Sequence, residues 1–424
     1  MRVLFLTTSD HANPAAGGRT RIVSEQRYAL LDLCQVTILC LVPPRQWIHP
    51  LRYFHARRAL QRDARCPVYY CPALPVFGRF RVRTITTAIH ALVVWLFAVA
   101  LRIRGIHAHG QTAAVIGLRA RRMGLRCWVI FDAHGAGPEE YAFAAPNPDR
   151  RWLAQLVRDE KAILSCADEV ICVSRAMQKY YREKYKLQRD LWCVVPCATS
   201  ATVGWDVRAR ARLRQQFKLG ERFVFVYAGS YRKYQMADEM VALFKAIKQE
   251  LSEAYFLILT GDRARFGNAA TVGGLTKEDY RIVSLSHEEV LHTLPVADVG
   301  FLLRADSPVN RVASPTKFAE YCICGVPALL TPYVGDYSRV VEEEQLGFCL
   351  SELSVSPRLM HFLRDVQAHR EAFAVRCHHY ASQHLTWASA GTTLREAYDR
   401  LSSGPAGQGP SRESTRQTPA RTAD

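Results

Sequence analysis

The sequence lacks the cysteine spacing that binds metals or forms redox pairs. Its thirteen cysteines are scattered through apolar surroundings, and no two of them have C-x-x-C spacing. This pattern is typical of reduced thiols in a cytosolic compartment and does not indicate structural zinc. The apolar run in the first ten residues is too short for the hydrophobic region of a signal peptide, and it predicts a buried first strand instead.

Long hydrophobic runs are also scarce. The one candidate for a membrane segment is the uncharged stretch 84–101, in which the continuous apolar run is the eleven residues Ala91–Leu101. A spanning helix needs about 20 apolar residues. The sequence therefore favours a buried helix here, with an interfacial helix and a membrane span as the alternatives.

Acidic residues are almost missing from one part of the chain. Between Arg45 and Arg126 fifteen arginines stand against a single acid, Asp63, and the net formal charge is +15 over residues 1–199 but only +2 over the remainder. Such one-sided charge predicts an anionic partner, which is nucleic acid, an acidic membrane surface, or a phosphorylated or acidic small molecule. Arginine-rich codon usage would account for 46 Arg against 10 Lys, but not for the missing acids.

The sequence does have enough apolar material for two domains. It contains 424 residues, 49% of them hydrophobic, which excludes a small protein held together by disulfides and a disordered protein. Short apolar runs rich in β-branched residues alternate with longer segments of helical period. This alternation predicts parallel sheets covered on both faces, and its two sets predict an α/β protein with two Rossmann-like domains. The expected strands are Val3–Thr7, Val36–Leu41, Gly105–Ala108, Cys127–Asp132, Glu169–Val173, Phe223–Ala228, Tyr255–Thr260, Ile282–Leu285, Val299–Leu303 and Pro327–Leu330.

Changes in composition suggest the domain limits. A strand-like run ends at Pro196 before a polar segment, which predicts an N-terminal Rossmann-like domain at residues 1–197 and a C-terminal one at 198–379. A helical segment at 380–402 is expected to pack back toward the first domain. Residues 403–424 are low in complexity and lack apolar anchors, so they are expected to form a disordered tail.

Two loops that contain glycine are candidates for binding phosphate. Gly17 and Gly18 lie where the first strand hands over to a helix, and Gly229 ends a later strand just before Arg232 and Lys233. Glycine lets backbone N–H groups approach a ligand, a helix N-terminus favours an anion, and the two cations offer charge-assisted hydrogen bonds. A plain turn and a solvated loop are the alternatives, and the absence of G-x-G-x-x-G argues against a dinucleotide site.

The segment that begins at Ser314-Pro315 is the most informative in the chain. If a helix starts after the proline, its first turn presents free N–H groups together with Thr316 and Lys317, and Glu320 lies one turn further along. A cation and a helix N-terminus suit a diphosphate, and a carboxylate suits vicinal hydroxyls. These are the requirements of a nucleotide-diphosphate sugar. The alternative is a simple helical ion pair between the lysine and the glutamate.

This segment resembles the donor-site signature of glycosyltransferase family 4 and related GT-B enzymes, in the variant reading S-P-T-K-F-x-E-Y-x-x-x-G-x-P. The likeness extends over most of the chain, through residues 168–177, Val194–Pro196, Phe225–Ser230, Ala297–Arg304 and Gly335-Asp336. The resemblance implies a GT-B fold, in which two Rossmann-like domains face each other across a cleft and the second holds most of the nucleotide sugar. It also implies metal-independent transfer with retention of anomeric configuration.

One position departs from the family pattern. Glu320 matches the second glutamate of the family's paired-glutamate motif, which is usually assigned to the ribose hydroxyls. The first glutamate is expected eight residues earlier, where this sequence has Val312. The usual contact to the sugar hydroxyls and the identity of the donor sugar therefore stay unassigned.

Two histidines follow strands of the first domain, His109 and His134. The carboxyl ends of these strands are expected to open toward the crevice between the domains. His134 resembles the family's cleft histidine near the acceptor and the reacting sugar, and with Glu320 it is the expected catalytic pair. We interpret its role as positioning, by accepting a hydrogen bond from a sugar hydroxyl. His109, Glu139 and Glu140 are candidate acceptor-side residues, and purely structural histidines are the alternative.

The expected function is that of a retaining glycosyltransferase that needs no metal or other cofactor. It would move a sugar from a nucleotide-diphosphate sugar to a glycan, lipid-linked or small-molecule acceptor, in surface polysaccharide or glycoconjugate biosynthesis. We expect a cytoplasmic protein that docks peripherally on an anionic membrane surface through the region Arg45–Arg126. A GT-B nucleotide-sugar epimerase or an inactive homologue is the alternative, kept open by Val312. Nucleic-acid binding is disfavoured, because the basic stretch lacks a recognition module.

Overall fold

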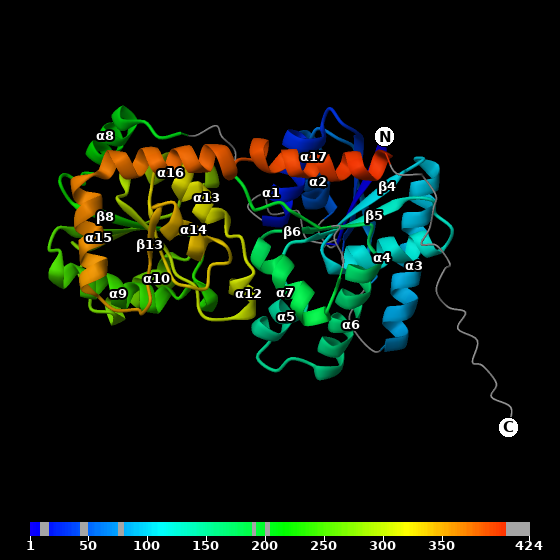
Figure 1. Cartoon of the computed structure of the whole chain (residues 1–424), viewed down its shortest axis with the longest axis horizontal. Helices are drawn as coiled ribbons and strands as arrows, with labels where there is room; N and C mark the ends of the chain where they lie inside the picture. The colour runs from blue at the N-terminus through cyan, green and yellow to red at the C-terminus, as the bar shows by residue number, and fades with distance from the viewer. Residues whose placement is uncertain (9–16, 43–49, 75–79, 189–191, 200–203, 404–424) are drawn as a thin grey trace, which may run out of the picture.

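The structure, a computed structural model, describes residues 1–8, 17–42, 50–74, 80–188, 192–199 and 204–403. In this part of the chain the strands form two parallel β-sheets, each covered by helices (Figure 1). The predicted α/β architecture of two Rossmann-like domains is confirmed. The tail expected at 403–424 lies outside the described residues except for Ser403, and so does Arg45 at the start of the basic region.

The first sheet has seven strands, all paired in parallel. In spatial order they are β3 (Val68–Pro72), β2 (Gln35–Val42), β1 (Arg2–Thr7), β4 (Gly105–His109), β5 (Trp128–Ala133), β6 (Glu169–Cys172) and β7 (Trp192–Val194). Its helices are α1 (Gly17–Ser24), which continues into the π-helical turn η1 (Glu25–Leu30), α2 (Pro50–Ala64), α3 (Phe80–Ala100), α4 (Gln111–Arg122), α5 (Gly137–Ala144), α6 (Arg150–Cys166) and α7 (Arg175–Tyr185).

The second sheet has six strands, also all parallel. Their spatial order is β10 (Tyr280–Val283), β9 (Ala254–Leu259), β8 (Phe223–Ala228), β11 (Val299–Leu302), β12 (Ala328–Leu330) and β13 (Gly347–Cys349). Its helical elements are α8 (Val207–Gln216), η3 (Lys233–Gln235), α9 (Ala237–Glu250), α10 (Arg263–Val272), α11 (His287–Thr293), η4 (Leu294–Val296), α12 (Pro308–Arg311), α13 (Thr316–Ile323), α14 (Tyr337–Glu343) and α15 (Pro357–Ala368).

Alternate side chains of each central strand enter different halves of the core. In β1, Leu4 and Leu6 pack on the face covered by α3, α4 and α6, whereas Val3 and Phe5 pack on the face covered by α1 and α2. All four are completely buried. Because a strand covered on both faces must be apolar on both, the sequence shows continuous hydrophobic runs instead of alternation.

The strand order places a ligand-binding edge in each sheet. The order reverses between β1 and β4 in the first sheet and between β8 and β11 in the second. In open parallel sheets, ligands bind outside the carboxyl ends of the strands at such a reversal. The segments after these strands therefore frame the candidate site.

Two long helices at the end of the described chain connect the domains. Helix α16 (Arg370–His384) packs on α13 of the second domain, and α17 (Trp387–Ser403) packs on η1 of the first. They run along the same edge of the molecule in Figure 1. The phenol oxygen of Tyr398 lies 2.8 Å from Nδ1 of His107, so the last helix reaches the centre of the first sheet.

Segments that follow the carboxyl ends of the two sheets contact each other directly. Ser174 donates its hydroxyl to the carbonyl oxygen of Val312 at 2.7 Å, and the Asp336 carboxylate accepts the backbone N–H groups of Arg175 and Ala176 at the start of α7. The side chain of Val312 is buried among apolar residues of the first domain. The position where the family pattern has its first glutamate is therefore an apolar contact between the domains.

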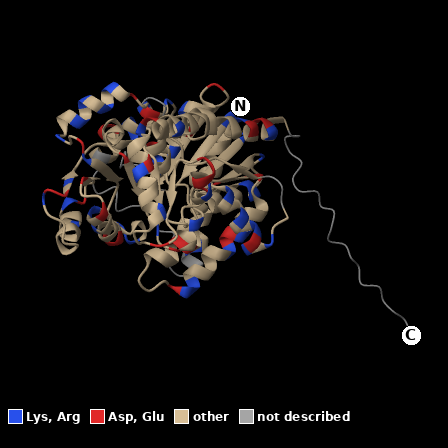
Figure 2. Cartoon of the chain, turned by 60° about the vertical axis from the view of Figure 1, so that its left-hand side comes forward, with Lys and Arg blue, Asp and Glu red and all other residues tan. Residues whose placement is uncertain are grey.

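Arginine is only partly available at the surface. Figure 2 shows Lys and Arg over both domains, with acidic residues among them. Within the basic region, Arg83 pairs with Asp159 and Arg121 with Asp168. Some of the excess charge therefore stabilises the first domain internally. All thirteen cysteines are free thiols.

The helix expected at 84–101 differs from its prediction. It forms as part of α3, and Ala91, Val94 and Ala98 are buried in the core as expected. The opposite face is exposed, however, although it too is apolar. The prediction of a buried helix is therefore wrong for one face, because an apolar run does not reveal which of its sides meets another element.

Candidate functional site

The centre of the first half of the site is Asp132, near the end of β5. Its carboxylate is fully buried and accepts two hydrogen bonds from the Arg21 guanidinium, at 2.7 and 2.9 Å. His134 Nε2 lies 2.9 Å from Oδ2 of the same carboxylate, and His109 Nδ1 lies 3.2 Å from it. Burial alone would raise the pKa of Asp132, but the charge of Arg21 and the contacts of the histidines hold it well below its usual range.

His134 is the member of this group that reaches solvent, with 28% of its side chain exposed. Its Nε2 is occupied by Asp132, which leaves Nδ1 on the other side of the ring. A Cβ atom on Gly18 would lie 3.8 Å from that Nδ1, so the start of α1 stands beside the free edge of the imidazole. The structure thus brings together two residues predicted from separate loops. Gly17 begins α1, and residues 9–16 before it lie outside the described chain.

His109 lies behind His134 and not at the surface. It is buried, stacks on His107 with the ring centroids 4.4 Å apart, and contacts Asp132. Burial and the neighbouring His107 lower the pKa of His109 well below its usual range. The buried ring lies 3.3 Å from Nε2 of His134 through its Nδ1, a contact that supports the position of His134.

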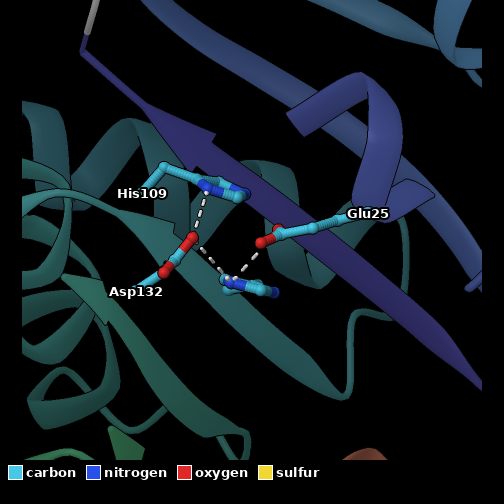
Figure 3. A group of neighbouring side chains, drawn as sticks. Glu25, His109 and Asp132 are labelled. Carbon is cyan, nitrogen blue, oxygen red and sulfur yellow. Dashed lines mark ion pairs between the residues drawn. The ribbon is translucent and has the colours of Figure 1, made fainter. Parts of the chain in front are cut away.

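Glu25 completes a buried group that has the residue types of a metal site. Figure 3 shows Glu25, His109 and Asp132 pointing toward one another, and the ligand atoms of these residues and His107 all lie within 4.8 Å of each other. The place of a cation is taken by Arg21, which lies 2.9 Å from Glu25 as well as bonding to Asp132. Burial outweighs this cation and raises the pKa of Glu25 well above its usual range. A metal ion would have to displace the guanidinium, so we assign none here.

The two glutamates of α5 lie near the same end of the sheet. Glu139 accepts a hydrogen bond from the Lys184 ammonium group at 2.6 Å. The carboxylate of Glu140 packs against Gly135, where a Cβ atom would collide with it, and its burial raises the pKa of Glu140. Glu139 is thus committed to an internal contact, while Glu140 adjoins the loop that carries His134.

The second half of the site surrounds Lys317, on the first turn of α13. Its ammonium group donates to the phenol oxygen of Tyr227 at 3.3 Å and to the amide oxygen of Gln235. A Cβ atom on Gly229 would lie only 2.4 Å from Nζ, so any side chain at this position, where the chain leaves β8, would displace the lysine. The predicted residues Gly229 and Lys317 therefore meet at the reversal of the second sheet.

Arg304 is a cation that the sequence analysis did not assign. It follows the carboxyl end of β11, is buried, and lies over the Tyr234 ring at 5.2 Å. Burial, together with the charge of Arg304, lowers the pKa of Lys317 well below its usual range. Neither cation forms an ion pair within the part of the chain that the structure describes. A lone arginine directly after a predicted strand was the signal that could have identified it.

The predicted cations Arg232 and Lys233 are both exposed. Arg232 directly precedes η3, and Lys233 is its first residue. Ser314 is buried instead, and its hydroxyl accepts the backbone N–H of Cys197 from the first domain at 3.0 Å. Pro315 precedes α13, and Thr316 is its first residue. Of this predicted set, the serine therefore joins the domains, while the proline and threonine shape the helix N-terminus.

Glu320 does not pair with Lys317, the alternative suggested by their spacing. Its carboxylate lies 2.7 Å from Nε2 of His287, the first residue of α11, and the side chain is largely buried. The hydrogen bond to Glu320 raises the pKa of His287. No local sequence pattern indicates this histidine, because the two residues are 33 positions apart and only the tertiary structure brings α11 to α13.

Comparisons with known proteins agree with this architecture. Residues 17–198 match the family model of the glycosyl transferase 4-like domain. No curated protein matches the chain. Among solved structures, it is similar to sucrose-phosphate synthase from Thermosynechococcus elongatus (18% identity, TM-score 0.70, covering 95% of this chain and 99% of that one).

Two other similar structures share this fold. One is HepE of Anabaena, solved in complex with UDP, at 17% identity and a TM-score of 0.67, covering 95% of this chain and 100% of that one. The other is WaaG, a glycosyltransferase involved in lipopolysaccharide biosynthesis, at 13% identity and 0.61, with the same two coverages. At identities this low, the similarity shows the fold alone, over 95% of this chain.

Proposed function

Since the chain has a GT-B-like fold and residues 17–198 match the glycosyl transferase 4-like domain, we propose that it is a glycosyltransferase that transfers a sugar from a nucleoside-diphosphate sugar with retention of anomeric configuration and without a metal ion. The acceptor is a glycan, a lipid-linked sugar or a small molecule. The structure of HepE in complex with UDP supports a nucleotide-sugar donor, and the involvement of WaaG in lipopolysaccharide biosynthesis supports a product of the surface-glycoconjugate class.

The observation that carries this proposal is the pair of cations at the reversal of the second sheet. Lys317 and Arg304 converge on Tyr227, Tyr234 and Gln235, beside the N-terminus of α13. Arg304 is buried and Lys317 half-buried, and neither forms an ion pair with a carboxylate among the described residues. Two such neighbouring cations raise the electrostatic energy of the free protein, and a diphosphate would relieve it. The helix N-terminus adds backbone N–H donors for the same anion.

The chemistry of such a site is the departure of a nucleoside diphosphate. Negative charge develops on the leaving phosphate oxygens as the bond to the sugar breaks, and fixed cations in a site that excludes water stabilise that charge. Lys317 and Arg304 would do so without a metal. Glu320 would accept hydrogen bonds from the ribose hydroxyls, and His287 would have to release the carboxylate oxygen it now contacts.

On the acceptor side, His134 presents the free edge of its ring while Asp132 holds the other nitrogen. This arrangement fixes the orientation of the imidazole, as a buried carboxylate does for many functional histidines. We propose that Nδ1 of His134 hydrogen-bonds a hydroxyl of the reacting sugar or acceptor. Val312 offers no carboxylate to the donor sugar, so the sugar hydroxyls would be held by other groups.

We further propose that the protein works in the cytoplasm at the membrane face, where a lipid-linked acceptor would be presented. The support is the charge of the first domain, in which Arg58, Arg62, Arg102 and Arg104 are exposed. An epimerase or an inactive relative would share the donor site, and only the detection of sugar transfer separates these from a transferase.

The test is calorimetric titration of the full chain with UDP, GDP, ADP and their sugars, alongside a DNA duplex. We expect UDP, the nucleotide in the HepE complex, to bind and the duplex not to bind. Replacing Lys317 or Arg304 with Ala removes a charge-assisted hydrogen bond worth about 1.5–3 kcal/mol, which weakens binding about 10- to 100-fold. Lys277→Ala is the matched control, because Lys277 precedes the amino end of β10, at the edge of the sheet opposite the site. Unchanged affinity in both site variants would remove the proposed phosphate site.

A further inference from the structure

Helix α3 is apolar on two opposite faces. One face, with Ala91, Val94 and Ala98, belongs to the core of the first domain. The opposite face is a stripe at spacings of four, three, four and three residues, which places its members along one side of a helix. We call it the α3 stripe, and its members and their exposed fractions are Ile85 (60%), Ile89 (42%), Leu92 (45%), Leu96 (53%) and Val99 (49%).

Helix α3, which carries the stripe, lies at the end of the molecule away from the second domain (Figure 1). Its helix is long and apolar enough to cross a membrane by length and composition, but its inner face is tied to the domain. Arg83 pairs with Asp159 of α6, and His90 accepts the backbone N–H of Leu74 at 2.9 Å. A membrane span would break these contacts and expose the core. A helix lying in the plane of an interface keeps all of them.

Positive charge gathers at the C-terminal end of the stripe. The segment 84–101 has no charged residue, and Arg102 and Arg104 follow it directly, both exposed. Arg2 joins them by donating to the carbonyl oxygen of Leu101 at 3.1 Å. These three arginines line an open hollow of about 540 Å³, in which Asp32 is the single acid among the lining residues. An apolar stripe that ends in a cluster of arginines matches the acyl chains and phosphates of a lipid surface.

We propose that the α3 stripe docks the enzyme on an anionic lipid bilayer, with α3 lying in the interface and Arg2, Arg102 and Arg104 against the phosphates. This inference rests on the proposed function, for which it names the docking surface. A second copy of the chain fits less well, because it would bring the same arginines together with no acid on α3 to balance them. Anionic headgroups supply the opposite charge.

The test is co-sedimentation of the full chain with vesicles of phosphatidylcholine alone or mixed with phosphatidylglycerol, at low and high salt. We expect binding to the mixed vesicles that weakens with salt. The double variant Leu92→Gln/Leu96→Gln removes two half-exposed apolar side chains, and we expect binding to fall about 10- to 100-fold. Arg102→Gln/Arg104→Gln should reduce binding to the mixed vesicles about 30-fold, and the binding that remains should depend less on the salt concentration.

The matched control is Val272→Gln/Val375→Gln, which changes two exposed apolar residues of the other domain and should bind as the unaltered chain does. The docking surface is refuted if the unaltered chain ignores mixed vesicles, or if the two leucine changes leave binding intact. Light scattering that shows a dimer of the unaltered chain and a monomer of the leucine variant would assign the stripe to a second copy and overturn the proposal.

Nucleotide binding by the same proteins separates this inference from the proposed function. All residues changed in the vesicle test lie outside the donor site, so UDP affinity should be equal in every variant. If the unaltered chain binds UDP but not the mixed vesicles, the docking surface alone is overturned. Vesicle binding without binding of any nucleoside diphosphate would overturn the donor assignment alone.

Discussion

Gly229→Ala is a sharp test of the phosphate site, because it acts on Lys317 without removing it. Gly229 has a φ of +151°, and a Cβ atom there would lie 2.4 Å from Nζ and 2.6 Å from Cε of the lysine. Ordinary contacts begin near 3.4 Å, so the ammonium group must move by about 1 Å. The neighbour is the end of a flexible side chain, and the protein is therefore expected to fold with the lysine displaced.

Two effects of different size follow. The strained backbone conformation should cost about 1 kcal/mol in the free energy of unfolding. Displacement of the ammonium group loses a charge-assisted hydrogen bond to the ligand, worth about 1.5–3 kcal/mol, so UDP affinity should fall about 10- to 100-fold. The loss of affinity is thus expected to exceed what the loss of stability would suggest.

Calorimetric titration with UDP and urea denaturation measure the two effects separately. Gly220→Ala is the matched control, because Gly220 also has a positive φ, +55°, but a Cβ atom there would meet nothing within 4 Å. It should lose similar stability and bind UDP normally. If Gly229→Ala binds UDP as tightly as Gly220→Ala does, then Lys317 does not hold the phosphates and the reasoning fails.

Three other outcomes are expected. Asp132→Asn leaves the buried guanidinium of Arg21 without its main counter-charge and should cost about 3–5 kcal/mol in urea denaturation, whereas a cost below about 1 kcal/mol would contradict the buried network. The hydrogen bond to Glu320 raises the pKa of His287 in the folded chain. The pair therefore stabilises the folded state fully at pH values below the pKa of an unfolded histidine, about 6.5, and this stabilisation is lost as the pH rises through the folded pKa. Because His287 is half exposed, His287→Ala should destabilise by no more than about 1 kcal/mol near pH 6 and not measurably near pH 9, as melting curves across pH will show. Since the pKa of Lys317 is lowered in the free chain and an anion would raise it, UDP should bind with proton uptake and more weakly as the pH rises, which titration in buffers of different ionisation enthalpy detects.

The local pattern was a good guide to single elements. The strand expected at Phe223–Ala228 has these bounds in the structure, because a short run of buried β-branched and aromatic residues has one stable arrangement between two layers of helices. The short edge strands β3 and β13 were not among the expected strands, and β7 was indicated only as a strand-like run before Pro196. Edge strands are covered on fewer sides, so their hydrophobic signal is weaker.

The candidate site was predictable where its residues share a motif. Lys317 and Glu320 come from one helical turn, and their spacing indicated a donor site before any contact was known. Arg304 and His287 belong to other strand-to-helix connections, so their approach to this turn depends on strand order. The pairing of Arg21 with Asp132 spans 111 residues and lies beyond any local pattern.

By itself, the sequence determined the α/β class, the two-domain organisation and the residue types for a nucleotide sugar, because helical and strand periods and strand-end loops are local properties. Only the tertiary structure decided that Val312 seals a contact between domains, that Arg304 joins Lys317, and that α3 leaves one apolar face exposed. The physical reason is that burial and electrostatic partnership are set by which elements pack together, and one sequence period is compatible with several packings.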